Sequence, residues 1–324
     1  MITMRSLGGT IAVACILGGC STTQQVQTYI RDAHVTGPVA SPPVHVVTDD
    51  SRNAATLTFY AVQQGKDVLS GNIEGAGTNS WLYKPELIQR PDGSTVTTRV
   101  IPQYNMDWKR PELSGGIHLD LAWNATALSF GGAFARTSGV SRFGWQLGVG
   151  LFTKEASDVR LRLDAGIFGQ YLDYQARTAT ITTTSAQWLF GSSSSVDTAY
   201  YFDKDTKGGL GYYGSLTINS AKSSWPVNFF VQLNCVVQPV LSYTPVSRTT
   251  TDFALIIPIQ TSSSSAEVST RATFVGITPG VYIEPAPNLI LTGGVRYLLD
   301  MSDTIKDPEH MLMPFVQLGV RTGF

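Results

Sequence analysis

The sequence predicts an all-β protein, folded as an up-and-down antiparallel transmembrane β-barrel of about ten strands, within a range of eight to twelve. Three observations lead to this fold class. Apolar side chains occupy every second position in many segments after residue 54, which is the period of a strand with one apolar face. The connections between these segments alternate between short and long. After the N-terminus, no apolar run approaches the ~20 residues of a membrane helix.

The clearest alternation lies in residues 227–243, where apolar positions such as Phe229, Val231 and Leu233 are interleaved with Asn228, Gln232 and Asn234. The closing residues, 310–324, have the same period. Read in this way, the chain has strands near residues 55–64, 115–124, 127–136, 141–153, 157–176, 207–220, 226–246, 268–285, 288–300 and 310–324.

The connections sort by length along the chain. Tight turns are expected at 125–126, 154–156, 221–225 and 286–287, and long loops near 65–114, 177–206 and 247–267. Short turns at one end and long loops at the other are typical of transmembrane barrels, in which the turns are periplasmic and the loops extracellular. An even number of strands then predicts that both chain ends lie on the periplasmic side.

The N-terminal residues 1–19 have the charged, apolar and small-residue parts of a secretory signal peptide. They end in Leu17-Gly18-Gly19-Cys20, which resembles the lipobox of bacterial lipoproteins. That resemblance implies cleavage before Cys20, acylation of its thiol, and, with Ser21 following, delivery to the outer membrane. The alternative is an ordinary signal peptide with an incidental cysteine. Residues 20–53 are rich in Thr, Gln, Pro and Val and predict an acylated tether.

Residues 54–324 resemble bacterial outer-membrane β-barrel proteins, without indicating a particular family. The last strand resembles the C-terminal assembly signal of that class, because it alternates from Met313 onward and ends in the aromatic Phe324. The resemblance implies outer-membrane lipid, the barrel-assembly machinery and the lipoprotein-processing machinery as partners, and an unknown extracellular ligand for the loops. The nearly balanced 23 Lys+Arg and 24 Asp+Glu argue against a nucleic-acid binder.

A barrel of ten strands encloses a narrow lumen that side chains nearly fill. Polar residues at the inward positions of the predicted strands should form a salt-bridged and hydrogen-bonded network there, because an isolated buried charge is costly. The residues of this predicted network are Arg160, Arg162, Asp164, Gln232, Asn234, Arg296 and Arg321. The alternative for the same residues is a selective path for a small solute.

Motifs for cofactors, metals and serine hydrolases are absent, since the sequence lacks a CxxC pair, HExxH, Walker A and GxSxG. No cofactor or metal site is therefore predicted. His118 and Asp120 are weak catalytic candidates, because His beside carboxylates can act as a general base. We expect them to meet Asp173, Asp300 and His310 at the outer rim, where omptin proteases have an Asp and His constellation.

These observations favour a non-enzymatic outer-membrane barrel lipoprotein with a binding or structural role through its surface loops. A narrow channel for small solutes is the first alternative, and a rim hydrolase that resembles omptins is the second. A rival architecture is a soluble periplasmic β-sandwich, in which the apolar strand faces would be buried.

Overall fold

The computed structural model describes residues 21–48, 53–65, 67–74, 84–89, 95–100, 103–137, 140–153, 158–188, 191–220, 226–254, 257–286, 288–302, 304–307 and 310–323. Within these ranges, no helix is both long enough and apolar enough to cross a bilayer.

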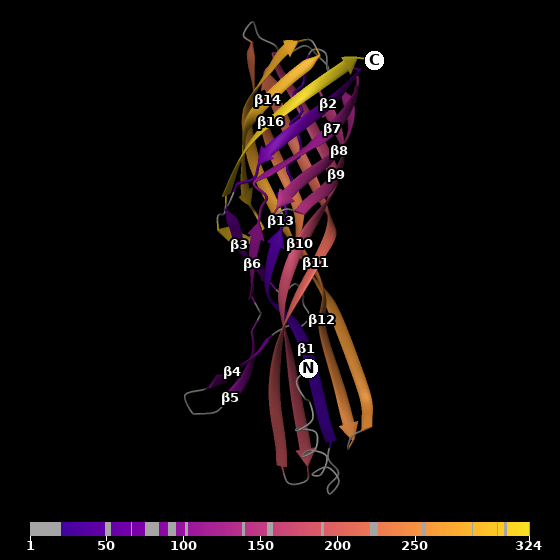
Figure 1. The fold of residues 1–324 in the computed structure, drawn as a ribbon, viewed down its shortest axis with the longest axis vertical. Coiled ribbons are helices and arrows are strands. Elements are labelled where there is room, and N and C mark those ends of the chain that lie inside the picture. Colours follow the sequence, from indigo (N-terminus) through magenta and orange to yellow (C-terminus); the bar gives the residue numbers. More distant parts are fainter. Residues whose placement is uncertain are drawn as a thin grey trace.

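Within the described ranges, ten antiparallel strands form a closed barrel, which confirms the predicted fold class (Figure 1). The barrel strands are β2 (Ala54–Gln63), β7 (Leu113–Trp123), β8 (Thr126–Thr137), β9 (Val140–Phe152), β10 (Val159–Trp188), β11 (Gly191–Ser220), β12 (Val227–Ala254), β13 (Ile257–Ala286), β14 (Leu289–Asp300) and β16 (His310–Gly323). The first and last of them pair from Ala54 with Gly323 to Val62 with Phe315, and β11 pairs with β12. Each strand therefore has a partner on both sides, and the wall has no free edge.

The two faces of the wall differ as a membrane barrel requires. In β16 the even-numbered residues are exposed and the odd-numbered residues are buried from Met311 to Arg321. Exposed apolar side chains surround the barrel at Leu57, Phe59, Ile117, Phe130, Leu147, Val149, Leu161, Leu163, Val231, Leu233, Val275, Ile277, Leu291, Val316, Leu318 and Val320. An apolar outer band around a polar interior fits lipid, and it contradicts the rival sandwich, whose apolar faces would be buried.

The barrel has two unlike ends. At the turn end, Asn124 adopts a positive φ of 57° in the tight β7–β8 turn. At the other end, which we call the hairpin end, the β10–β11 ladder continues to Trp188 and Gly191, and the β12–β13 ladder continues to Ala254 and Ile257 (Figure 1). The loops expected at 177–206 and 247–267 are therefore mostly strands. Their Thr- and Ser-rich sequences lack apolar alternation because these parts of the hairpins lie outside the barrel.

Strand β1 (Ser21–Thr36) lies between these two hairpins and pairs antiparallel with both β10 and β12. The expectation of an irregular tether is therefore wrong for this segment. Ser21 pairs with Gln187 and with Ala254, close to the hairpin tips, whereas Gly323 lies at the turn end. The described ends of the chain thus lie at opposite ends of the molecule, and the expectation that both lie on one side is also wrong.

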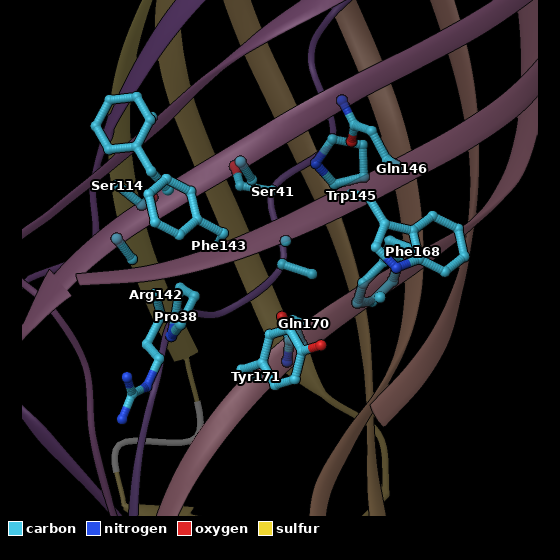
Figure 2. Close-up of a pocket in the computed structure, with 18 of the residues that line it drawn as sticks. Pro38, Ser41, Ser114, Arg142, Phe143, Trp145, Gln146, Phe168, Gln170 and Tyr171 are labelled. Carbon is cyan, nitrogen blue, oxygen red and sulfur yellow. The ribbon is translucent and has the colours of Figure 1, made fainter. Parts of the chain in front are cut away.

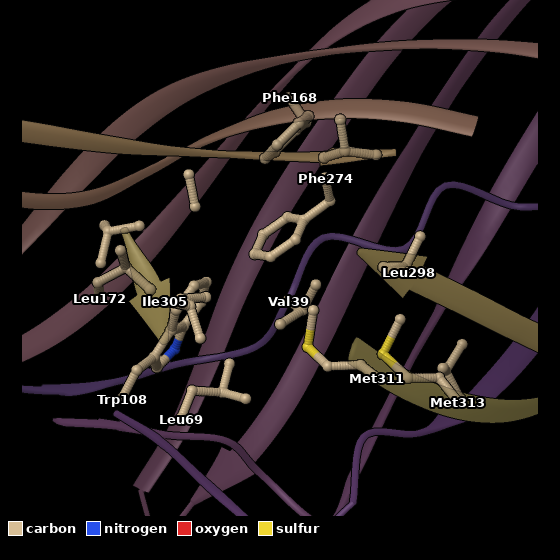
Figure 3. Packing of buried hydrophobic residues seen from close by; sticks show 14 of the residues in the cluster. Val39, Leu69, Trp108, Phe168, Leu172, Phe274, Leu298, Ile305, Met311 and Met313 are labelled. Carbon is tan, nitrogen blue, oxygen red and sulfur yellow. The ribbon is translucent and has the colours of Figure 1, made fainter. Parts of the chain in front are cut away.

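The hairpin end of the barrel is covered by strands from the predicted loop 65–114 and by a short strand near the C-terminus. These are β3 (Val68–Glu74), β6 (Gln103–Lys109) and β15 (Ile305–Asp307), and β6 also pairs in parallel with β1. Trp108, Leu69 and Ile305 from these strands are buried in one hydrophobic cluster with barrel side chains such as Phe274 and Leu298 (Figure 3). A separate hairpin is formed by β4 (Lys84–Gln89) and β5 (Thr95–Val100).

Candidate functional site in the barrel lumen

Residues 37–48, which follow β1, run through the inside of the barrel. They are called the lumen segment below, and they form no regular secondary structure. Gly37 accepts a hydrogen bond of 2.8 Å from the Trp108 indole at the hairpin end, and Val47 contacts Asn219 near the turn end. Twelve residues can reach at most roughly 40 Å, which is enough to pass through the ~30 Å of a bilayer's hydrocarbon core.

Amide side chains of the wall bind the backbone of the lumen segment in pairs of hydrogen bonds. In each case the side-chain oxygen accepts from a main-chain N–H, and the side-chain NH₂ donates to a main-chain carbonyl. The four pairs are Gln64 with Val39 (3.0 and 3.0 Å), Gln238 with Ala40 and Pro38 (2.8 and 2.8 Å), Gln317 with Val44 (3.1 and 3.4 Å), and Asn219 with Val47 (3.0 and 2.8 Å). These contacts replace the strand partners that the segment lacks.

Arg296 completes this set near the middle of the segment. Its guanidinium donates a 2.7 Å hydrogen bond to the carbonyl oxygen of Pro42 and a further bond to the Ser41 hydroxyl. Prolines at 38, 42 and 43 have no N–H, so the segment offers fewer donors that need partners. A proline-rich chain is therefore well suited to pass through a narrow lumen.

A buried triad of charges lies on the lumen wall. Arg162 on β10 donates to both oxygens of Asp120 on β7, at 2.7 and 2.8 Å, and its Nε donates to Asp164 at 2.9 Å. The two carboxylates thus share one guanidinium. Because β8 and β9 lie between β7 and β10, the side chains must reach across two strands, and the glycines of those strands give them room. A Cβ at Gly150 would lie only 2.6 Å from Asp164 Oδ1.

The other residues of the predicted lumen network, Arg160, Gln232, Asn234 and Arg321, are also buried. Gln232 donates to the hydroxyls of Ser215 and Thr217, at 3.3 and 3.2 Å, and Asn234 donates to Thr278 at 2.7 Å. These two amides therefore bind the wall itself and not the lumen segment.

The five residues expected at the outer rim do not converge. His118 and Asp120 are buried in the lumen, where His118 faces Gln146 and His45 of the lumen segment. Asp173 binds Arg142 on β9, Asp300 binds Ser302, and the His310 ring lies against Tyr297. The rim placement of His118 was wrong because β7 begins at Leu113, so His118 lies in the middle of the strand.

A lateral pocket crosses the wall near the hairpin end (Figure 2). Strand β9 pairs with β10 only as far as Gly144 with Gln170, and β1 takes over as the partner of β10 from Asp173. A cavity of about 60 Å³ lies at this change of partner. It is lined by outward aromatic side chains, such as Phe143 and Tyr171, and by Pro38–Pro42 of the lumen segment. The Arg142–Asp173 ion pair bridges the two strands beside it.

Two predicted sites, the lipidation site Cys20 and the assembly signal Phe324, lie outside the described residues. Sequence reasoning missed the lumen segment, together with Gln64 and Asn219, which bind it. The available signal was the proline-rich stretch at 37–43 directly before a barrel that has inward-facing amides.

The architecture is that of a bacterial outer-membrane β-barrel: a closed antiparallel wall, an apolar outer band and a polar, filled interior. No protein family matches the sequence, and no curated protein does so either. Among solved structures, the chain is similar to the outer membrane protease OmpT from Escherichia coli, with 9% identity, a TM-score of 0.32, and coverage of 94% of this chain and 97% of that one.

Two further solved structures show a similarity of the same order. Neisserial surface protein A has 11% identity and a TM-score of 0.25, with coverage of 84% of this chain and 99% of that one. The translocator domain of the autotransporter NalP from Neisseria meningitidis has 9% identity and a TM-score of 0.28, with coverage of 85% and 90%. The strand register and the outer apolar band establish the fold. These weak similarities give no information about activity.

The charge triad leads to a stability prediction. Replacing Arg162 by Met leaves Asp120 and Asp164 buried without their shared cation, which should lower the free energy of unfolding by about 3 to 5 kcal/mol. The matched control is Arg142→Met, whose pair with Asp173 is about 30% exposed and should cost at most about 1 kcal/mol. Urea unfolding in detergent micelles measures both, and equal losses would contradict the assigned role of Arg162.

Proposed function

We propose that this protein is an outer-membrane barrel lipoprotein with a binding or structural role at the cell surface, and that its own N-terminal chain closes the lumen. The observation that most supports this function is the lumen segment, which is bound by wall side chains from Val39 to Val47. A channel needs a continuous aqueous path, and this segment lies in the place where that path would run. We therefore favour the surface role over the channel.

The orientation that we propose puts the turn end in the periplasm and the hairpin end outside the cell, as in barrels with short periplasmic turns. The hairpin end then presents a five-stranded sheet in the order β11-β10-β1-β12-β13. From Asp173 to Gln187, β10 rises roughly 45 Å beyond the barrel. Exposed aromatic side chains, including Tyr200 and Phe202 on β11, make this sheet a suitable surface for an extracellular ligand.

Lipidation of Cys20 is part of the same proposal. The lipid would lie directly before Ser21, at the tips of the hairpins and roughly 45 Å from the barrel. In the proposed orientation it would not reach the bilayer that the barrel spans, so the barrel itself holds the protein in the outer membrane, contrary to the expectation of a lipid tether. The outer-membrane lipid, the assembly machinery and the lipoprotein-processing machinery remain the proposed partners.

Conductance in planar bilayers tests the closed lumen. The wild-type protein should show no steady conductance, because the lumen segment fills the barrel. Replacing Gln64, Gln238 and Gln317 together by Ala removes three of the four amides that bind the segment, and this variant should show frequent openings.

The matched control replaces Gln232 and Asn234 by Ala, because these lumen amides bind only the wall. This variant should stay as closed as the wild type. A large, steady conductance of the wild-type protein would refute the closed lumen and favour the channel.

Labelling of intact cells tests the proposed orientation. In a Cys235→Ser background, Ser194→Cys at the tip of the β10–β11 hairpin should react with a membrane-impermeant maleimide, because its side chain is exposed outside the barrel. Asn124→Cys, in the β7–β8 turn, should react only after the cells are permeabilised. The reverse pattern would place the hairpin end in the periplasm.

A further inference from the structure

Three potential metal ligands from distant parts of the sequence meet inside the barrel. His45 belongs to the lumen segment, whereas His118 and Asp120 belong to β7. One ring nitrogen of each histidine and one carboxylate oxygen of Asp120 all lie within 4.8 Å of one another. The two imidazole rings are close, with centroids 4.8 Å apart.

His118 has a free ring nitrogen in this cluster. Its side chain is fully buried, and its Nε2 atom has no hydrogen-bond partner. The other ring nitrogen, Nδ1, lies 2.6 Å from the amide nitrogen of Gln146. Binding of a cation through Nε2 requires a half-turn of this amide, after which the amide oxygen accepts from Nδ1–H and the Nε2 lone pair is available. A histidine that is oriented through one nitrogen and coordinates through the other is the usual arrangement in metal sites.

Two carboxylates and two guanidiniums surround the cluster, and Asp120 is the acid that faces the two histidines. Arg162 is the shared partner of Asp120 and Asp164, so two carboxylates face one guanidinium in this triad. A carboxylate has about four acceptor positions, and Asp120 therefore keeps acceptor capacity after its two bonds to Arg162. Arg321 lines the adjacent cavity and is the other charged group that a bound cation would face there.

The site also has room for a solvent ligand. A cavity of about 40 Å³ borders His45 and Asp120, and the hydroxyls of Thr56 and Thr58 are among its lining groups. A volume of this size accommodates water beside polar partners. Two imidazoles, one carboxylate and one water form the ligand set of an open tetrahedral zinc site.

We propose that His45, His118 and Asp120 bind Zn²⁺ and thereby link the lumen segment to the barrel wall. Ligand atoms around tetrahedral zinc are roughly 3.4 Å apart, so separations that now reach 4.8 Å must shorten by up to about 1.4 Å. The backbones of Val44 and Val47 on either side of His45 are held by Gln317 and Asn219, so the adjustment has to come from rotation of the side chains. Bound zinc therefore holds the lumen closed.

Calorimetric titration of the full, tag-free protein with zinc chloride tests this site, after treatment with EDTA in detergent. The wild type should bind one Zn²⁺ per chain, and Co²⁺ in its place should give the visible absorption of a tetrahedral site. His45→Ala and His118→Ala should each abolish this saturable binding. Gln146→Leu, which removes the orienting amide, should weaken it by roughly 10- to 100-fold.

The chain offers matched controls, because it contains only four histidines. His34→Ala and His310→Ala change the two histidines outside the cluster and should bind zinc as the wild type does. Heat-modifiable gel mobility shows whether each variant is folded. Absence of saturable zinc binding by the wild type overturns the proposal, as does full zinc binding by folded His45→Ala, or loss of binding in either control.

Discussion

Beyond Gly37, whose N–H donates to Lys109 on β6, the described main-chain bonds of the lumen segment are made to wall side chains, and these bonds determine much of the interior. A peptide group that is buried without a hydrogen bond costs several kcal/mol, and no bulk water is available at this depth. The wall supplies Gln64, Gln238, Gln317 and Asn219, each of which matches the donor and acceptor of a peptide. These amides offset the cost of burying the segment's irregular backbone at the peptide groups that they bind.

The lumen also contains buried charged side chains. Arg162 lies between Asp120 and Asp164, and glycines on the intervening strands leave the space that these side chains need. Such a network is a polar core surrounded by an apolar outer face, which is the reverse of a soluble protein. At the hairpin end, Trp108 and its apolar neighbours pack in one buried cluster with barrel side chains.

The sequence was sufficient to predict the barrel but not the path of its N-terminal chain. Each barrel strand faces lipid on one side and the polar lumen on the other. Its apolar residues therefore alternate with polar ones, as in residues 310–323, and this alternation can be recognised in the sequence. Strand β1 lies in a sheet outside the barrel, and its partners on β10 and β12 are far away in sequence. Its Thr- and Gln-rich sequence therefore shows no apolar period.

The candidate sites were predictable only in part for a similar reason. The inward positions of Arg162, Gln238 and Gln317 follow from strand parity, but their partners do not. His118 and Asp120 share a face of β7, whereas His45 reaches them only because the chain passes through the lumen. No local motif connects these three residues, so a search by spacing has nothing to detect.

Hydrogen–deuterium exchange of the backbone amides in residues 37–48 tests the central claim most directly. If the lumen segment is bound as described, the amides of Val39, Val44 and Val47 will exchange as slowly as those of the barrel strands. In the variant with Ala at Gln64, Gln238 and Gln317, Val39 and Val44 will lose this protection, while Val47, bound by Asn219, will keep more of it. Exchange of all three wild-type amides at the rate of an unstructured chain would contradict the account.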